Sequence, residues 1–294
     1  MREVDVKIIN EEIYKAFTKL CFKYDESTYL KINEAYKNSE GREKKVLELL
    51  LENEKEAKEK AVPLCQDTGM AIVNMEIGQD VRLMGTDINK AINDAVSRAY
   101  KDVYLRCSVV DDPLFNRINT KDNTPAVIHY EIVGGEEIKI TCLAKGFGSE
   151  NASKLIMLNP SDGIEGVKKE VIEQVKLKGA NACPPLSIGI GIGGTFDYAA
   201  YLAKKALLRE NEYNVNPLYK ELEIELKKMI NDLNIGPAGL KGKNTCLSVK
   251  IEEYPTHIAG LPLAININCH AVRKEVIVIW ENWCYRLMKR PENL

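Results

Sequence analysis

The chain has 294 residues, 45% hydrophobic and 29% charged, and can bury a sizeable core as one large domain or two modest ones. Its net charge of −2, spread without a basic stripe, argues against nucleic-acid binding. No stretch approaches 18 uncharged apolar residues, and the N-terminus has neither signal-peptide nor transit-peptide character, so no membrane partner is expected. We expect a cytoplasmic protein whose eight cysteines are reduced.

Residues 4–60 follow a helical pattern. Apolar side chains recur at helical spacing first around Ile13 and Phe17 and again around Leu47 and Leu50. The run ENEKEAKEKA at 52–61 alternates in charge and is most simply a solvated helix face. The N-terminal region therefore predicts helices without a strand.

From residue 61 onward the patterns alternate between strand and helix. In chain order, they predict a strand over 70–77, a helix over 87–103 capped by Thr86 or Asp87, and paired strands over 125–133 and 137–143 joined at Gly134 and Gly135. The segment 145–153 is predicted to be a loop. Further along they predict helices over 164–178, 196–209 and 218–233, with Gly179 ending the first of them.

The last third returns to strands, over 247–254 and 261–268, followed by a strand or helix around 276–287. The fold class is therefore mixed α/β: a helical N-terminal part, 1–60, followed by an α/β core, 61–294, with a mixed sheet. No repeat or low-complexity linker divides the chain, although two lobes are compatible with the pattern.

The cysteines fall into two groups. Cys21, Cys142 and Cys284 lie in apolar helical or strand patterns and are predicted to pack in the core. Cys246 is also predicted to be structural, and the role of Cys107 is open. Cys65, Cys183 and Cys269 instead lie at the ends of elements, beside proline, glycine or polar residues. Loop thiols of this kind suit metal ligation or catalysis, and zinc competes with an iron–sulfur cluster as the metal.

The run GIGIGG at 189–194 matches the pattern GxGxxG and precedes a helix. A lone match of this kind is a weak signal, and it does not open the first βαβ unit of a dinucleotide fold. We interpret it as close packing of a strand against a helix behind Cys183.

Five motifs occur in order along most of the chain. They are CQDTG at 65–69, LRCSVVDDPLFNRINTKDNTPAVIHYE at 105–131, KGFGSENAS at 145–153, CPPLSIGIGIGGTFDYAAYLAKKALLR at 183–209, and PTHIAGLPLAININCHAVR at 255–273. Together they strongly resemble the α-subunit of the class I, iron–sulfur-dependent fumarate hydratases, and of the related L-tartrate dehydratases.

The resemblance implies a [4Fe-4S] cluster held by Cys65, Cys183 and Cys269 on loops at element ends, with one iron left without a cysteine ligand. That open iron acts as a Lewis acid on a small dicarboxylate substrate. It also implies that residues 1–294 form a single α-subunit catalytic domain whose cluster-binding core is 61–294.

Other site residues follow from the same resemblance. Arg106 would clamp a substrate carboxylate, and His257 would contact the substrate, although a lone histidine is more often structural. Gln66 and Asp67 would contact the substrate, with Asp67 in proton transfer; an Asx-turn is the plainer role for Asp67.

The glycine loop completes the implied site. Gly146 and Gly148 would bring backbone N–H groups to the substrate or cluster. Two positions depart from the family's usual residues: Phe147, where glycine is frequent, and Cys107, where proline is common. The first departure is expected to reshape the edge of the pocket.

The implied activity is reversible hydration of fumarate to L-malate, with tartrate dehydration as the near alternative and a non-catalytic redox-sensing subunit as another. Single-chain class I enzymes carry a C-terminal domain with further substrate-binding residues and a base, and nothing after Arg273 is long enough to supply them. A separate fumarate hydratase β-subunit, in an α2β2 or similar heteromer, is therefore expected.

Overall fold

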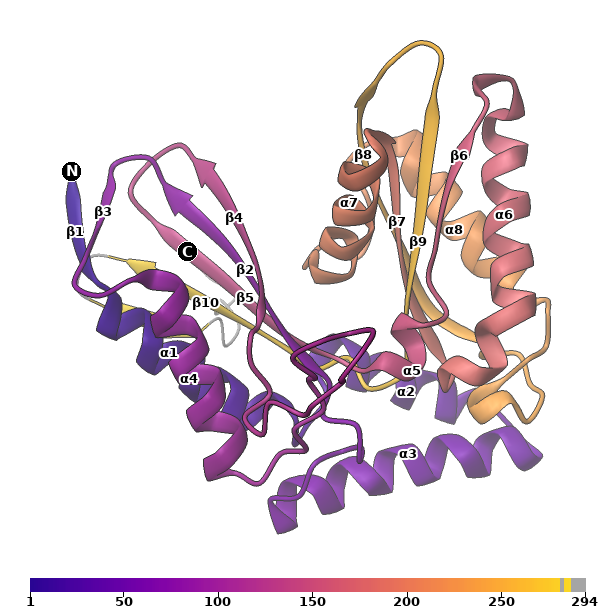
Figure 1. Ribbon diagram of the computed structural model, residues 1–294. Helices are drawn as coiled ribbons and strands as arrows, with labels where there is room; N and C mark the ends of the chain where they lie inside the picture. Colours follow the sequence, from indigo (N-terminus) through magenta and orange to yellow (C-terminus); the bar gives the residue numbers. More distant parts are fainter. Residues whose placement is uncertain (281–282, 287–294) are drawn as a thin grey trace, which may run out of the picture. The chain divides into compact units, whose positions relative to one another are not determined.

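The computed structural model describes residues 1–280 and 283–286 (Figure 1). Contacts divide the chain into two compact units. Unit 1 contains Met1–Asp25, Glu54–Lys145 and the segment from Arg273, and unit 2 contains Glu26–Asn53 and Gly146–Val272. Within the described ranges, every helix is too short or too polar to cross a lipid bilayer.

Unit 1 is a five-stranded sheet with helices on one face. Its elements are β1 (Arg2–Asp5), α1 (Val6–Leu20), β2 (Met70–Gly78), β3 (Val81–Met84), α4 (Ile88–Asp102), β4 (Val127–Val133), β5 (Ile138–Lys145), β10 (Lys274–Trp280) and β11 (Trp283–Arg286). The strand order is β11-β10-β5-β2-β4, with β2 and β4 parallel and the other pairs antiparallel. Strands β1 and β3 form a separate parallel pair.

Helices α1 and α4 cover one face of this sheet (Figure 1). Alternate residues of β5 (Ile138, Ile140 and Cys142) are fully buried against the apolar stripes of the two helices. Asp87 caps α4, because its Oδ1 accepts a hydrogen bond from Lys90 N at 2.8 Å. The predicted strand 70–77, helix 87–103 and cap are therefore confirmed.

The predicted pairing of the strands on either side of Gly134 and Gly135 is wrong. Strand β2 lies between β4 and β5 and pairs with both. The two-glycine connection instead crosses the end of β2, where Gly78 N donates to Glu137 O and Gln79 N donates to Val133 O, each at 2.8 Å. Nearly all of β2 is buried, and a central position satisfies its backbone groups on both sides.

Unit 2 is a four-stranded sheet between helices. Its elements are α2 (Glu26–Lys37), most of α3 (Gly41–Lys60), α5 (Phe147–Glu150), β6 (Lys154–Leu158), η1 (Pro160–Asp162), α6 (Gly163–Lys178), η2 (Gly179–Ala182), β7 (Leu186–Gly194), α7 (Phe196–Leu208), α8 (Pro217–Asn231), η3 (Pro237–Gly239), β8 (Cys246–Thr256) and β9 (Leu261–Asn268). The strand order is β6-β9-β7-β8, with β7 and β8 parallel.

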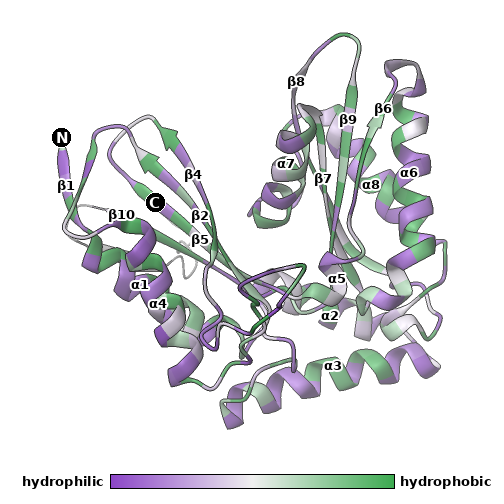
Figure 2. Ribbon diagram, viewed as in Figure 1, coloured by the Kyte–Doolittle hydropathy of each residue, from purple (hydrophilic) through white to green (hydrophobic). Residues whose placement is uncertain are grey.

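Alternation along β7 separates the two faces of this sheet. Ile188, Ile190 and Ile192 are buried with the apolar residues of α6 and α8, and the intervening glycines face α7. A Cβ built on Gly191 would lie 2.1 Å from Ala199 O, so only glycine lets α7 approach this closely. The interpretation of 189–194 as close packing of a strand against a helix is confirmed. Figure 2 shows hydrophobic residues, in green, recurring along β7 and β9.

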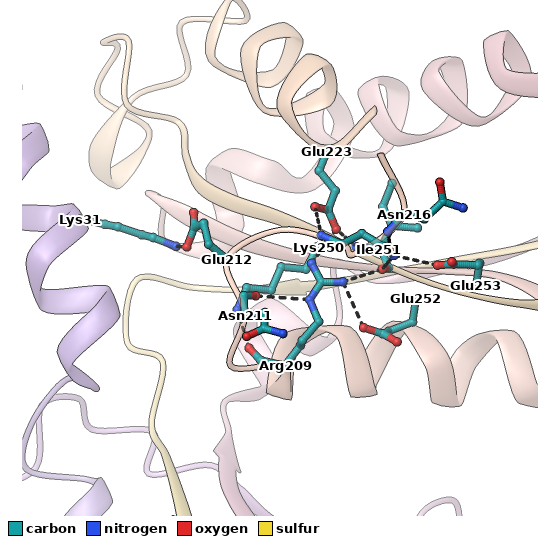
Figure 3. Close-up of polar contacts among 11 residues, drawn as sticks. Lys31, Arg209, Asn211, Glu212, Asn216, Glu223, Lys250, Ile251, Glu252 and Glu253 are labelled. Carbon is teal, nitrogen blue, oxygen red and sulfur yellow. Dashed lines mark hydrogen bonds and ion pairs between the residues drawn. The ribbon is translucent and has the colours of Figure 1, made fainter. Parts of the chain in front are cut away.

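A buried polar network closes the loop between α7 and α8 (Figure 3). The carboxylate of Glu223 is fully buried, pairs with Arg209 Nη2 at 2.6 Å, and accepts hydrogen bonds from Ile251 N at 2.7 Å and Asn214 N at 2.8 Å. Arg209 Nη1 also pairs with Glu252 Oε1 at 3.1 Å. Because each Glu223 oxygen has a partner, the network holds the loop to β8 without an orphaned charge.

Several predictions need correction. The predicted loop 145–153 contains α5. The predicted helix 164–178 is confirmed as α6, which ends at Lys178 with Gly179 as its C-cap, although Gly179 has right-handed helical geometry and begins η2. Strand β1 precedes the first helix. The division into compact units is a different one from the predicted division at residue 60, since α2 contacts β8 within unit 2. The mixed α/β fold class is confirmed, and the assignment of 1–294 to one catalytic domain stays a prediction.

Candidate functional site

The predicted site residues are divided between the two units. Cys65, Gln66, Asp67 and Arg106 belong to unit 1. The others, Gly148, Cys183, His257 and Cys269, belong to unit 2. We describe each group within its own unit.

The first group is built around the loop 65–69, between α3 and β2. Cys65 and Asp67 are half-buried and Gln66 is exposed. Asp67 Oδ1 accepts a hydrogen bond from Gly69 N at 2.9 Å, which is the Asx-turn that the sequence D-T-G favours. Gly69 has φ +80°, and a Cβ there would lie 2.8 Å from the Lys145 carbonyl carbon. The turn and the close approach both require glycine.

The loop that carries Arg106 lies beside the 65–69 loop in unit 1. Thr68 Oγ1 donates to Arg106 O at 3.1 Å. Asn123 joins the same two segments, because its Nδ2 donates to Gly69 O at 3.1 Å and its Oδ1 accepts from Ser108 N at 2.8 Å. The Arg106 residue is exposed. Unit 1 thus brings a thiol, a carboxylate and a guanidinium onto two joined loops.

In unit 2 the loops of Cys183 and Cys269 are directly connected. His270 N donates to Cys183 O at 3.2 Å, so the residue after Cys269 contacts the backbone of Cys183. Cys183 is exposed and has φ +53°, a left-handed conformation that is uncommon outside glycine. Cys269 is half-buried at the end of β9. The conformation at Cys183 turns the chain sharply between η2 and β7.

His257 lies at the tip of the connection between β8 and β9. It is exposed and borders a hollow of about 450 Å³ with walls that include Tyr198 and Tyr254. The two tyrosine rings meet edge to face at 4.7 Å. His257 Nδ1 accepts a hydrogen bond from Ala259 N at 3.2 Å. In the neutral imidazole this bond assigns the proton to Nε2, so the outward nitrogen is a hydrogen-bond donor.

The predicted glycines lie at the start of α5. Gly146 is the N-cap residue of this short helix, and Gly148 lies within it and is exposed. A Cβ built on Gly148 would have nothing within 4 Å. The described residues therefore leave room for a side chain at position 148, so crowding within them does not explain why this residue is glycine.

Three of the remaining described thiols are buried in the cores, and the fourth, Cys107, is half-buried on a loop. Cys21, Cys142 and Cys246 are buried, as predicted for core residues. Burial raises the pKa of the Cys21 thiol to about 11 and that of Cys246 to about 12, so both stay protonated at neutral pH. Partial burial, with a smaller contribution from Asp122, also raises the pKa of Cys107. The side chain of Cys284 lies outside the described residues.

The donor set fits an iron–sulfur cluster in its chemistry. The seven cysteines with described side chains are thiols rather than disulfides, and Cys65, Cys107, Cys183 and Cys269 among them lie on loops within the motifs. Cys107 is the one of these four at a position where the family commonly has proline, so the ligand set that the resemblance implies is Cys65, Cys183 and Cys269. Thiolates are the ligands that iron–sulfur clusters prefer. In the described part of the chain, no three His, Cys, Asp or Glu side chains are gathered as a metal site. The three cysteines therefore match a cluster site in the type of ligand and in their placement on loops.

Three residues at this site were missed from the sequence. Tyr100, Asn123 and Arg273 are buried in unit 1, and each donates a hydrogen bond to a carbonyl of the 65–69 loop. Asn123 has φ +60°, and its sequence context, D-N-T-P, carries a recognisable turn signal. The sequence around Tyr100 indicates only a helix. That around Arg273 indicates only a charged residue before a strand, so neither carries a signal for the 65–69 loop.

Comparison with known proteins gives the family. A family model described as fumarate hydratase (Fumerase) matches residues 10–278. A putative L(+)-tartrate dehydratase subunit alpha from Methanocaldococcus jannaschii is 41% identical over 277 residues, which cover 91% of this chain and 96% of the relative. The L(+)-tartrate dehydratase subunit alpha of Escherichia coli strain K12 is 33% identical over 222 residues, which cover 74% of this chain and 72% of the relative.

The chain therefore belongs to the fumarate hydratase family, a family of hydro-lyases. The resemblance based on the five motifs is confirmed. The roles of the individual residues within those motifs stay predictions.

Proposed function

We propose that this chain is the α-subunit of a [4Fe-4S]-dependent hydro-lyase that hydrates fumarate reversibly to L-malate. The observation that carries the proposal is the set of three thiols, Cys65, Cys183 and Cys269, on loops at element ends in a member of the fumarate hydratase family. The buried thiols Cys21 and Cys246, whose pKa values burial raises, are poor ligands by comparison.

The three loop thiols would hold the cluster and leave one iron without a cysteine ligand. When bound, such a cluster supplies a Lewis acid that takes the substrate hydroxyl and a carboxylate. The residues of this chain then bind and orient the dicarboxylate. Arg106, exposed on the loop joined to 65–69, would pair with a substrate carboxylate through two parallel hydrogen bonds.

His257 would serve as a donor to the substrate. Its Nδ1 accepts from Ala259 N, so the neutral ring offers Nε2–H to a carboxylate or hydroxyl oxygen. Gln66 would add a side-chain amide, Gly148 a backbone N–H, and Asp67 would take part in proton transfer. These assignments give the chain several substrate contacts but not the base that removes the proton from carbon.

A fumarate hydratase β-subunit would supply that base and further carboxylate contacts in an α2β2 or similar heteromer. Support comes from the relatives, whose names describe them as alpha subunits. The chain alone is therefore expected to turn over little substrate.

Dehydration of L-tartrate is the second candidate. It is favoured by a specific observation: relatives at 41% and 33% identity are named as tartrate dehydratase subunits, whereas the family model is named for fumarate hydratase. Malate and tartrate both carry a hydroxyl next to a carboxylate, so the same ligand loops would serve either substrate. They differ in one hydroxyl, which a hydrogen-bonding site can discriminate strongly.

The test is anaerobic co-expression of this chain with its β-subunit, followed by assays on fumarate, L-malate and both tartrate enantiomers. Turnover of fumarate and malate at least ~10²-fold above that of tartrate supports the first candidate. The reverse ratio selects tartrate. A complex that carries iron and sulfide yet turns over none of the four substrates would favour a redox-sensing subunit and overturn the proposed enzyme.

A further inference from the structure

The carbonyl groups of the 65–69 loop are held by buried side chains. Arg273 Nη1 donates to Asp67 O. Tyr100 Oη lies 3.1 Å from Thr68 O and 2.9 Å from Gly69 O, and Asn123 Nδ2 lies 3.1 Å from Gly69 O. Three consecutive carbonyls are thus bound by these three side chains, and the buried Cys21 thiol adds a longer contact of 3.8 Å to Thr68 O, all within unit 1.

These donors lie deep in the unit. Asn123 is 0% exposed, Tyr100 1% and Arg273 2%. Among the described residues, the Arg273 Nε atom has no hydrogen-bond partner and no carboxylate forms an ion pair with Arg273. Burying a cation without a paired carboxylate is unfavourable. The arrangement is therefore a poor way to stabilise the unit and an effective way to fix one loop.

Asn123 extends the arrangement to a second loop. Its Oδ1 accepts from Ser108 N at 2.8 Å, while its Nδ2 holds Gly69 O. One amide therefore fixes the distance between the loop of Cys65 and the loop of Arg106. Its left-handed backbone, φ +60°, is a conformation that asparagine adopts more readily than most residues.

We propose that Tyr100, Asn123 and Arg273 form a carbonyl clamp that holds Cys65, Asp67 and Arg106 in register for ligand and substrate binding. The clamp residues are positioning residues: they act on the loop backbone and leave the reacting groups to Cys65, Asp67 and Arg106. The inference rests on the proposed function for its purpose, but its structural effect can be measured without substrate. A tight clamp means that the loop is already ordered before iron is bound.

Two conservative variants test the clamp. Tyr100→Phe removes one hydroxyl that serves two carbonyls, and Asn123→Asp replaces the donor by a carboxylate oxygen while retaining the acceptor for Ser108 N. Tyr14→Phe and Asn10→Asp are matched controls in unit 1, because Tyr14 bonds to Asp102 on the surface and Asn10 Nδ2 donates to Ala91 O at 2.7 Å. Each control removes the same chemical group, a tyrosine hydroxyl or an asparagine amide NH2, at a position away from the 65–69 loop.

The first measurement is hydrogen exchange of the full chain without metal, followed by mass spectrometry of peptides. In Tyr100→Phe we expect amides in 64–70 to exchange ~10-fold or more faster, because Thr68 O and Gly69 O each lose a buried donor. In Asn123→Asp the same increase should appear in both 64–70 and 105–109, because the link from Gly69 O to Ser108 N is broken. The second is iron bound per chain after anaerobic reconstitution, which should fall in both variants at 25 °C. The controls should match the wild type in both measurements.

The outcomes separate the clamp from the proposed function. Exchange in 64–70 that is unchanged, or that rises equally across all of unit 1, overturns the clamp. Iron uptake equal to wild type in both variants overturns its role in ligand positioning. If the loop loosens as expected but wild-type chain binds no iron–sulfur cluster at all, the clamp stands and the proposed cofactor falls.

Discussion

The loops of Cys65 and Cys183 are fixed by different means. Around Cys65, buried side chains from distant parts of the chain bind the backbone carbonyls of the loop. Around Cys183, backbone groups bind one another: His270 N donates to Cys183 O at 3.2 Å, and Ala238 N donates to Pro184 O at 2.8 Å. The first loop depends on the identity of a few side chains, whereas the second depends on the path of the backbone.

This difference predicts how each loop responds to substitution. A side-chain clamp can be removed one donor at a time, with local loosening as the result. Backbone bonds between η3, the Cys269 loop and the Cys183 loop survive most side-chain changes and are lost when unit 2 itself unfolds. Only replacement of the thiols themselves should disable both loops in the same way.

The largest expected effect is therefore the loss of a loop thiol. Cys65→Ser, Cys183→Ser and Cys269→Ser should each abolish visible cluster absorption and all turnover of the complex, because a hydroxyl is a far poorer ligand than a thiolate for iron. Iron and sulfide per chain, measured after anaerobic reconstitution, check the result.

Cys142→Ser and Cys246→Ser provide the matched controls, because both thiols are buried in apolar cores. They should retain the cluster while losing stability. Retention of a full cluster in Cys269→Ser, together with its loss in Cys246→Ser, would show that the wrong third ligand has been named.

Local patterns predicted much of the fold and little of what holds the site. The apolar alternation of β9 and the cap at Asp87 are encoded by neighbouring residues, and both were predicted. The pairing of β4 with β2 was missed because it joins segments far apart in sequence, and the nearby glycines imitate a hairpin. Arg273 lies 206 positions from Asp67, so no local signal could assign it to the loop.

The same reason limits what the sequence says of the ligands. Cys65, Cys183 and Cys269 stand out individually because a thiol beside proline, glycine or polar residues does not suit a core. The sequence does not show that these cysteines lie on loops in contact, because His270 and Cys183, whose backbones are hydrogen-bonded, belong to two separate motifs. The ligand set therefore came from resemblance to a family, while the loop positions came from the residues.

The second prediction concerns the stability of unit 2. Glu223→Gln should lower the free energy of unfolding by about 3 kcal/mol, because it breaks a buried ion pair and leaves the partly exposed Glu252 as the remaining counter-charge of Arg209. Glu212→Gln is the control, since Glu212 pairs with Lys31 at the surface (Figure 3) and should cost under ~1 kcal/mol.

Urea denaturation measures both variants. If backbone bonds fix the Cys183 loop, folded Glu223→Gln should still bind iron to the wild-type stoichiometry at 10 °C. Equal stability losses in the two variants would contradict the importance of the buried pair, and lost iron binding in the folded variant would contradict the account of the loop.

The third prediction sharpens the role of His257. With Nδ1 bonded to Ala259 N, the contact with substrate is made by Nε2–H. The amide of glutamine can reach the position of Nε2 and that of asparagine only the position of Nδ1. His257→Asn should therefore lower kcat/KM by ~10²-fold, and His257→Gln by about 10-fold, with the cluster absorption unchanged in both. The opposite order would mean that Nδ1 faces the substrate.

The smallest expected effect compares the two units through their buried thiols. Burial raises the pKa of Cys21 in unit 1 to about 11 and that of Cys246 in unit 2 to about 12, against about 8.5 for a thiol in the unfolded chain. The folded chain therefore keeps a proton that the unfolded chain releases. Each thiol's contribution to stability is complete below pH ~8.5 and is lost as the pH rises toward the folded pKa, by about 2 kcal/mol at pH 10.

Denaturant unfolding at pH 8, 9 and 10 measures this loss, and Cys21→Ala and Cys246→Ala should each flatten the pH dependence. If the two units unfold in separate transitions, Cys21→Ala should flatten only that of unit 1 and Cys246→Ala only that of unit 2. If they unfold together, both variants should flatten one shared transition. A pH dependence identical to wild type in either variant would mean that its thiol ionises as readily folded as unfolded, which its burial argues against.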